Sequence, residues 1–397
     1  MALGSRESLS HVPSAKEWEE MKVLCMKHAV PGVGFYAMRK LSENGAACVP
    51  PREIIMELYA LERNMALANA KQTEDVMKLT WLFKQDGFCS CLLKGCGLAR
   101  MYPEGMQRMS GDIDIWVVPK GMENEPLQRR RREVLELCRR VVGRREVFYH
   151  HTDLPLKGKE IEVHFTPSWM FAPWHNRRLQ RFFQEEWKNR RFVRVQEGVA
   201  NAKTMTEGYY VPSLEMNAVY VLLHIYRHVF AEGVGLRQVV DYFYVLQQKG
   251  LDRERVISVL KSLGMVRFTS AVMWVMQEAL GLERALMLCE PDERRGRMLL
   301  NEILLAGNFG KWDERLSGMN RNSLLSRMIE NMHRNMRLVW HYPSEALCAP
   351  LWKMWQKAWR VGVEKGGGRI EYRVQSTDYR VQSTDKRLKG EGMKVER

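Results

Sequence analysis

Three short stretches decide the fold of this 397-residue sequence: LLKGCG at 92–97, RMSGDIDI at 108–115 and EIEVH at 160–164. Their surroundings alternate between apolar and polar positions, as strands do. We expect strands at 88–93, 113–118, 146–151 and 160–165, a turn near Gly158, and helices that begin at 95 and cover 124–142. This order of elements predicts a small module in which helices pack on a mixed sheet.

The Asp-Ile-Asp unit at 112–114 is the first candidate for chemistry. Because side chains alternate along a strand, Asp112 and Asp114 point to the same side, roughly 6–7 Å apart. Two carboxylates held this close repel each other unless a cation lies between them. Carboxylate oxygens suit Mg²⁺, which takes its other ligands from water and substrate phosphates. The pattern therefore predicts a Mg²⁺ site, which Mn²⁺ would also fit.

The later strand carries a third carboxylate, Glu162, on the same face as His164. If this strand neighbours the Asp-Ile-Asp strand, Glu162 lies beside the pair of aspartates. Three carboxylates can hold two metal ions, one that activates a hydroxyl and one that bridges the triphosphate and its leaving oxygen. We therefore expect Asp112, Asp114 and Glu162 to act together as catalytic, metal-binding residues.

The turn at Lys94 and Gly95 is a candidate phosphate-binding element. It leads from a strand into a helix, where backbone N–H groups and the helix dipole attract phosphate, and glycine permits a close approach. Arg108, Ser110 and Gly111 precede the aspartates, where they would contact a triphosphate. A surface lysine and ordinary turn glycines are the alternative, but the order and spacing of the whole set favour nucleotide binding.

These segments resemble a known family. Residues 88–116 are similar to the DNA polymerase beta-like nucleotidyltransferase superfamily, whose pattern is a glycine-led turn, Asp-x-Asp and a later carboxylate. Within it, the Lys-Gly, Arg-x-x-Gly-Asp-Ile-Asp and Ile-Glu-x-His segments resemble the bacterial uncharacterised nucleotidyltransferase family. The similarity extends over about 15–250 and includes HAV at 28–30, HIYRH at 224–228 and GLRQVVD at 235–241.

The resemblance implies a nucleotidyltransferase that uses a nucleoside triphosphate and Mg²⁺, with Asp112, Asp114 and Glu162 as metal ligands. The sequence also resembles the abortive-infection toxin nucleotidyltransferases, which implies a cognate partner protein as a further expectation. Cys96 stands where the superfamily usually has Gly or Ser. The interval from Cys96 to Asp112 is longer than in the superfamily, which predicts an inserted loop.

A polar set in the later helices is a second candidate. His224 and His228 lie one helical turn apart, followed by Arg237 and Asp241. We expect them to form a seam between the helices and the catalytic cleft and, with His164, to face the substrate. Buried, hydrogen-bonded structural histidines are the alternative.

The charge of the chain suggests a polyanionic partner. Lys and Arg number 62 and Asp and Glu 47, a net charge of +15, and 127–145 holds eight arginines from Arg129 to Arg145. Arginine pairs well with phosphate, so these residues would suit RNA. A solvated helix face is the alternative explanation.

The chain divides into four predicted segments. We expect helices at 1–65, a nucleotidyltransferase-like core at 66–211, a helical domain at 212–365, and a flexible tail at 366–397 that repeats YRVQSTD in tandem. The fold class is α+β, with a small mixed sheet between helical regions. The tryptophans Trp352, Trp355 and Trp359 follow helical spacing and predict a packing stripe.

The function expected from these features is Mg²⁺-dependent transfer of a nucleoside monophosphate to a hydroxyl of RNA, protein or a small molecule. An inactive nucleotide-binding or toxin–antitoxin partner protein and an RNA-binding module are the alternatives. The sequence shows no signal peptide, no membrane span and no disulfide or zinc pattern among its eight cysteines. We therefore expect a cytoplasmic protein.

Overall fold

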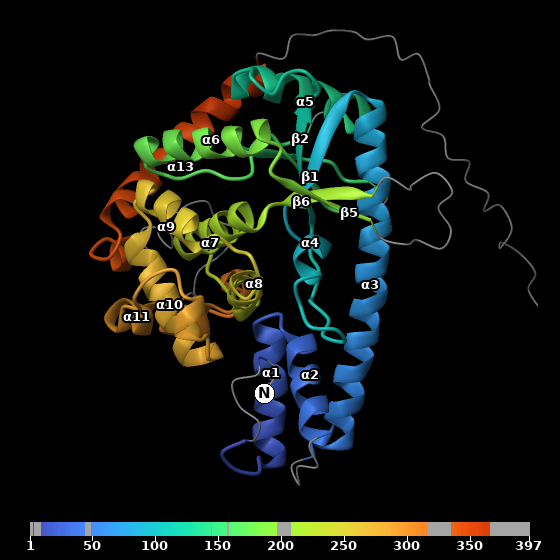
Figure 1. Ribbon diagram of the computed structural model, residues 1–397, viewed down its shortest axis with the longest axis vertical. Helices are drawn as coiled ribbons and strands as arrows, with labels where there is room; N and C mark the ends of the chain where they lie inside the picture. Colours follow the sequence, from blue (N-terminus) through green and yellow to red (C-terminus); the bar gives the residue numbers. More distant parts are fainter. Residues whose placement is uncertain are drawn as a thin grey trace, which may run out of the picture.

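The computed structural model describes residues 3, 9–43, 49–143, 145–156, 159–196, 208–313, 315 and 335–365. Figure 1 shows a small sheet enclosed by helices in the upper half of the molecule, with further helices below it. The predicted α+β class is confirmed, since one small mixed sheet lies between helical regions. The predicted turn near Gly158 and the predicted tail, with its tandem repeat, lie outside the described residues.

Three helices come first: α1 (Ala15–Lys27), α2 (Pro31–Glu43) and α3 (Arg52–Gln85). Ser14 caps α1 by accepting a hydrogen bond from the backbone N–H of Glu17, whose side chain accepts one from the N–H of Ser14. Pro31 begins α2, because proline suits the first turn of a helix. The three helices enclose a small core of their own, made by Trp18, Met38, Leu41, Ile54 and Leu58.

The helix α3 joins this bundle to the sheet. In Figure 1 its lower half packs beside α1 and α2, and its upper half reaches the strands. The predicted domain boundary between 65 and 66 falls inside α3. The bundle also contacts the loop before the Asp-Ile-Asp unit, since a Cβ on Gly32 would lie 2.0 Å from the carbonyl oxygen of Gln107. Only glycine allows that approach, so the bundle supports the loop directly.

The main sheet has the strand order β1-β2-β4-β3 and is built from β1 (Phe88–Leu92), β2 (Ile113–Pro119), β4 (Ile161–His164) and β3 (His151–Asp153). The central pair, β2 and β4, is parallel, and the two outer pairs are antiparallel. The parallel connection is made by α5 (Leu127–Val142), as a parallel pair requires a crossover.

Alternation along β2 separates two cores. Ile113, Ile115 and Val117 pack with α3 and α5 on one face. Trp116 and Val118 pack on the other face with the later helices. Asp114 lies on this second face, and it is the one acidic residue of β2, a strand whose every residue is buried.

The strand predicted at 146–151 is wrong. The backbone N–H of Phe148 donates to the carbonyl oxygen of His151, and Val147 forms an isolated bridge with Thr152. The chain therefore folds back on itself, and only His151–Asp153 forms a strand, β3. An apolar alternation that spans a tight turn looks like a continuous strand in the sequence.

Three elements here had no counterpart in the sequence prediction: α6 (Pro173–Lys188), β5 (Phe192–Val195) and β6 (Tyr209–Pro212). The strands β5 and β6 form an antiparallel pair, and β6 packs against β1. The helix α6 contributes Phe183 and Trp187, whose rings meet Trp116 of β2. The helix α6 thus covers the second face of the sheet, whereas Val195, Tyr209 and Val211 of β5 and β6 belong to the core of the first face.

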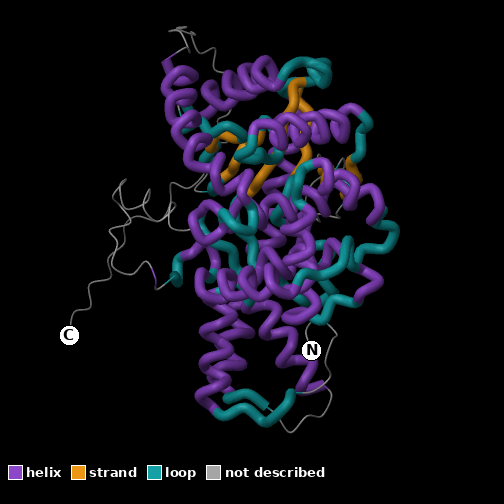
Figure 2. The backbone as a smooth tube through the Cα atoms, turned by 90° about the vertical axis from the view of Figure 1, so that its left-hand side faces the viewer, coloured by secondary structure: helices purple, strands orange, loops and turns teal. Residues whose placement is uncertain are grey.

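The remaining helices are α7 (Leu214–Ala231), α8 (Leu236–Leu246), α9 (Arg253–Ser262), α10 (Val266–Leu280), α11 (Glu293–Ala306) and α13 (Pro343–Lys365), with single 3-10 turns at Arg284–Leu286 and Asn308–Gly310. Helices thus make up most of the described part of 212–365, the range predicted to be a helical domain. Gly281 ends α10 in the left-handed conformation, as glycine does at helix C-termini. Figure 2 shows helices stacked below the strands, and in Figure 1 these include α8, α10 and α11, whereas α13 lies at the height of the sheet.

The tryptophan stripe lies on α13 and packs against the α5–β3 connection. The rings of Trp352, Trp355 and Trp359 all contact Tyr149, so the predicted packing stripe is confirmed. Within the described ranges, no helix is both long enough and apolar enough to span a membrane.

Candidate functional site

The carboxylates of Asp114 and Glu162 lie beside each other on neighbouring strands. In the parallel pairing of β2 and β4, Asp114 is the register partner of Glu162, so both side chains project from the same face. Asp114 is buried and Glu162 is partly exposed. Strand pairing therefore brings together two acidic residues that are 48 positions apart in the sequence.

Asp112 completes the acidic group. It directly precedes β2, and its side chain is exposed. Partial desolvation in the site, together with the negative charges of Asp114 and Glu162, raises the pKa of Asp112 to about 6. The three carboxylates predicted from the sequence thus lie close enough to repel one another.

Two groups that can carry positive charge contact Asp114. The Nζ of Lys94 lies 2.9 Å from Asp114 Oδ1. The Nε2 of His164 lies 3.1 Å from the same oxygen and 3.2 Å from Glu162 Oε2. Burial opposes ionisation of Asp114, but Lys94 and His164 outweigh it and hold the pKa of Asp114 below its usual range. His164 therefore lies between the two carboxylates.

For His164, burial and the contacts with the carboxylates shift the pKa in the opposite directions. Burial alone would lower it, but the hydrogen bonds to Asp114 and Glu162 raise the pKa of His164 above its usual value. Burial also raises the pKa of Glu162, and the contact with His164 outweighs that effect and lowers it. In the buried half of the site, Lys94 and His164 thus lie next to carboxylates of the opposite charge.

The turn at Gly95 depends on glycine. Gly95 has φ +66° and ψ −129°, a conformation that other residues adopt only with strain. A Cβ at Gly95 would also lie 3.0 Å from Oε1 of Gln72. Gln72 donates from Nε2 to the carbonyl oxygen of Gly111 at 2.7 Å. This α3 side chain therefore contacts both the turn after β1 and the residues before Asp112, while α4 (Cys96–Ala99) is a single helical turn.

Arg108 lies in the loop before Asp112 and is buried against α8. Its Nε and Nη2 donate to Oδ1 and Oδ2 of Asp241 at 2.7 and 2.8 Å, and the hydroxyl of Tyr102 donates to Oδ1 at 2.7 Å. The guanidinium predicted to contact a triphosphate thus holds the loop to α8. Ser110 is partly exposed and Gly111 is exposed between this anchor and Asp112.

The polar set on α7 and α8 borders the acidic group. The rings of His224 and His228 are 4.3 Å apart. Burial, together with the positive charge of Lys94, lowers the pKa of His224 well below its usual value. Arg237 donates from Nη1 to the carbonyl oxygen of Met109 at 3.2 Å. The predicted seam residues therefore lie between the later helices and the loop that carries Asp112.

Arg227, also on α7, was not singled out from the sequence. Its guanidinium lies over the ring of Trp169 and donates from Nη1 to the hydroxyl of Ser168 at 3.1 Å. Burial lowers the pKa of Arg227 to about 9, and its Nε has no hydrogen-bond partner among the described residues. A buried guanidinium without a carboxylate contact in this part of the chain is a candidate for binding an anion.

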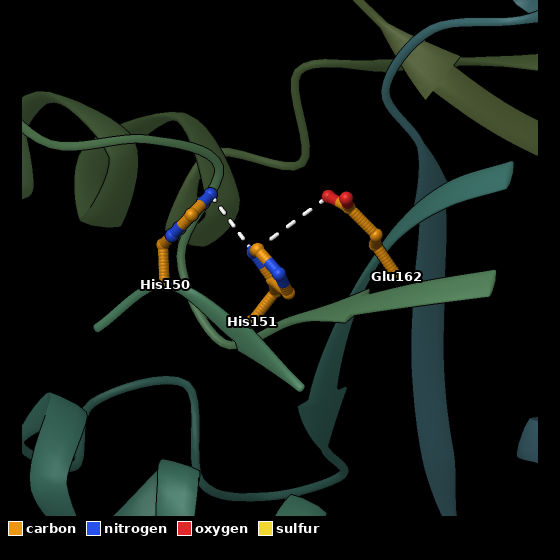
Figure 3. Close-up of side chains that lie close together, drawn as sticks. All are labelled: His150, His151 and Glu162. Atoms are coloured by element: carbon orange, nitrogen blue, oxygen red, sulfur yellow. Dashed lines mark hydrogen bonds and ion pairs between the residues drawn. The ribbon is translucent and has the colours of Figure 1, made fainter. Parts of the chain in front are cut away.

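Two further histidines join the group, and sequence reasoning missed them. Because β3 pairs with β4, His151 lies opposite His164, and Asp153 lies opposite Glu162. His150 Nε2 lies 2.9 Å from His151 Nδ1, which lies 3.6 Å from Glu162 Oε2 (Figure 3). The one signal in the sequence was a pair of adjacent histidines at the end of the strand predicted at 146–151, and β3 begins only at His151.

Groups spaced for metal binding occur twice among the described residues. One contains His150, His151 and Glu162, and the other contains Asp114, Glu162 and His164. Both use Glu162, which is the partly exposed member of each group. The acidic residues and their histidine neighbours therefore provide the oxygen and nitrogen donors that divalent cations use.

The arginine-rich helix α5 is divided between core and surface. Arg130 and Arg131 are buried, and Arg131 donates from Nη2 to the carbonyl oxygen of Tyr149 at 2.7 Å. Arg132 and Arg140 are exposed. Only part of the predicted basic segment is thus available to a polyanion, and Arg144 lies outside the described residues.

Comparison with known proteins assigns the family. No curated protein shows a significant match. The crystal structure of an antigenic nucleotidyltransferase-like protein from Paracoccidioides brasiliensis aligns with 57% of this chain and 96% of that chain, at 11% identity and a TM-score of 0.30, which is too low to assign a shared fold. The profile of the family described as Uncharacterised nucleotidyltransferase matches residues 14–281, more than half of the chain. The chain therefore belongs to the uncharacterised nucleotidyltransferase family.

Proposed function

We propose that this protein transfers a nucleoside monophosphate from a nucleoside triphosphate to a hydroxyl group. The observation that carries the proposal is the pairing of Asp114 with Glu162 across β2 and β4, with Asp112 directly before β2. Membership in a nucleotidyltransferase family supports it. Partial desolvation, and then the negative charges of Asp114 and Glu162, raise the pKa of Asp112, and a bound cation would neutralise that negative charge.

The carboxylates of Asp112, Asp114 and Glu162 fit a divalent cation such as Mg²⁺ or Mn²⁺, because oxygen donors are the ligands that these ions prefer. When bound, the cation neutralises the triphosphate and the pyrophosphate that leaves. Lys94 contacts Asp114 at 2.9 Å, so a cation that binds Asp114 would release this ammonium group to pair with a phosphate. The ion pair with Asp114 therefore keeps the ammonium group of Lys94 in the site until a nucleotide binds.

In the proposed reaction, the oxygen of the acceptor hydroxyl bonds to the α-phosphorus, and the bond from this phosphorus to the bridging oxygen of the β-phosphate breaks. Pyrophosphate leaves, and the proton of the hydroxyl passes to a carboxylate of the site. Arg227 and Arg237, on α7 and α8, would hold the phosphates through their positive charge, and the uncharged ring of His224 would donate a hydrogen bond to them. Arg108 acts as a positioning residue, because it anchors the loop that leads to Asp112.

The test is label transfer from each α-³²P-labelled nucleoside triphosphate, with Mg²⁺ or Mn²⁺, to RNA, protein and small-molecule fractions. We expect label in one fraction, which identifies the acceptor class. The Asp112→Asn/Asp114→Asn variant should lose the transfer, whereas Glu290→Gln, a change at an exposed carboxylate, should keep it. Absence of label in every fraction would contradict the proposal.

The same assay separates the alternatives. A triphosphate that binds without transfer would favour an inactive nucleotide-binding or toxin–antitoxin partner protein. The exposed arginines of α5 support RNA as the acceptor. RNA binding that weakens steeply with salt and survives Asp112→Asn, in the absence of transfer, would instead indicate an RNA-binding module.

A further inference from the structure

Three histidines and one carboxylate gather at the β3–β4 edge of the sheet. His150 and His151 come from the turn into β3, and Glu162 and His164 come from β4. His150, His151 and His164 are all buried, whereas Glu162 is 29% exposed at its side chain. The cluster thus has a buried nitrogen side and one open side.

The nitrogen atoms of this cluster cannot all be satisfied by hydrogen bonds among themselves. His151 Nδ1 faces both His150 Nε2 and Glu162 Oε2, and one ring nitrogen carries at most one proton to donate. The Nδ1 atoms of His150 and His164 have no hydrogen-bond partner within the described ranges. A single proton on His151 Nδ1 therefore cannot serve both His150 and Glu162.

The spacing of these atoms suits a shared cation. The nitrogens of His150 and His151 are 2.9 Å apart, and His151 Nδ1 and Glu162 Oε2 are 3.6 Å apart. With metal–ligand bonds of about 2.1 Å, such separations correspond to ligand–metal–ligand angles of roughly 90–120°. These are the angles of octahedral and tetrahedral coordination.

Neighbouring groups hold the imidazoles in place. The ring of Trp169 lies 4.0 Å from that of His150, and the ring of Phe148 lies 4.6 Å from that of His151. On the far side of His151, its Nε2 faces Asp153 Oδ1 at 3.6 Å. A carboxylate behind a ligating imidazole orients the ring and strengthens it as a ligand.

We propose that His150, His151 and Glu162 bind a divalent transition-metal cation, such as Mn²⁺, Co²⁺ or Zn²⁺, in preference to Mg²⁺. Imidazole nitrogen favours these ions, whereas Mg²⁺ favours oxygen alone. The carboxylates of Asp114 and Asp153 add negative charge nearby, against the positive charges of Lys94 and Arg227. The site shares Glu162 with the proposed catalytic group but does not require that transfer takes place.

The test is titration of chelator-treated protein with Co²⁺, read from the visible absorption of the bound ion. We expect one Co²⁺ ion per chain that excess Mg²⁺ does not displace, without the near-ultraviolet band of a cobalt–thiolate bond. His150→Ala/His151→Ala should weaken Co²⁺ binding by about tenfold or more. His11→Ala, a change at an exposed histidine, should leave Co²⁺ binding unchanged.

Unchanged affinity for the Mg²⁺-resistant Co²⁺ in the double variant, or displacement of all bound Co²⁺ by Mg²⁺, would overturn the assignment. If the double variant does not fold, X-ray absorption of the wild-type cobalt protein decides, since fewer than two imidazole ligands would exclude the site. Asp112→Asn separates the two proposals, because it should abolish transfer and retain Co²⁺ binding. Co²⁺ binding without any transfer in the wild type would leave this site standing and contradict the proposed function.

Discussion

Arg108 and Asp241 form a buried, two-bond ion pair that joins the loop before Asp112 to α8. The Nε–Oδ1 and Nη2–Oδ2 distances are 2.7 and 2.8 Å, and both side chains are almost fully buried. The pair bridges 133 residues of sequence. The position of Asp112 therefore depends on the helical domain as well as on the sheet.

Breaking this pair from one side should destabilise the protein strongly. Arg108→Met or Asp241→Met leaves the other charge buried without its partner, which costs about 3–5 kcal/mol. The double variant should lose less stability than either single variant, because no uncompensated charge remains. Urea unfolding of all four proteins measures the coupling, and strictly additive losses would contradict a direct interaction.

Gly95→Ala should lower stability and disturb the turn that carries Lys94. The φ of +66° and ψ of −129° are strained for alanine, at a cost of about 1–3 kcal/mol. The new Cβ would also lie 3.0 Å from Gln72 Oε1. Gly87→Ala is the matched control, since its φ is also positive but no atom lies within 4 Å of the added Cβ. Thermal unfolding should show a larger loss for Gly95→Ala, and equal losses would mean that the contact with Gln72 has no effect.

His28 should make stability depend on pH. It is fully buried, and burial together with Lys27 lowers the pKa of His28 to about 4, against about 6.5 in an unfolded chain. Between these values the unfolded chain binds more protons than the native protein. The stabilisation is therefore complete above pH 6.5 and is lost as the pH falls toward 4, by roughly 3 kcal/mol in total.

The neutral ring of His28 joins the first helices to α8 through a hydrogen bond. Its Nδ1 accepts a hydrogen bond from the backbone N–H of Leu236 at 3.3 Å. His28→Asn keeps an acceptor near that position and removes the titrating ring. Unfolding free energies from pH 4 to 7 should fall less steeply with acid in this variant, and parallel curves would show that other groups cause the dependence.

The helices of the later domain could be predicted because each has a local signal. The apolar periodicity of α7 to α10 continues over several turns, and Gly281 ends α10. The helix α6 was not predicted, although Leu179, Phe183 and Trp187 recur at helical spacing in its sequence PWHNRRLQRFFQEEWK. Its helical form depends on the packing of Phe183 and Trp187 against Trp116.

The residues of the candidate site could be predicted from the sequence where they belong to one strand. Asp112 and Asp114 follow from a single motif, but the contact of Asp114 with Glu162 depends on strand order. The partners of Arg108 and His151 depend on pairings with α8 and β4 that no local pattern encodes. Sequence reasoning therefore named the acidic residues together with Lys94 and His164, and it did not single out Arg227, His150 and His151.

The ion pair between Lys94 and Asp114 predicts that substitution of Lys94 changes the affinities for Mg²⁺ and for the nucleotide in opposite directions. The ammonium group lies 2.9 Å from Asp114 Oδ1, where it competes with a divalent cation and stands ready to bind phosphate. Lys94→Met should therefore raise the Mg²⁺ affinity of the nucleotide-free protein, because the competing charge is gone. The same change should weaken binding of the nucleoside triphosphate, because a phosphate loses a positive partner.

Isothermal titration calorimetry with Mg²⁺ alone, and then with a nucleoside triphosphate, measures both changes. Lys249→Met removes an exposed lysine outside the site and should alter neither affinity. If Lys94→Met weakens Mg²⁺ and nucleotide together, the lysine maintains the structure around Asp114 and does not exchange between cation and phosphate. A gain in Mg²⁺ affinity beside a loss in nucleotide affinity is the result that only exchange predicts, since a merely misfolded site would lose both.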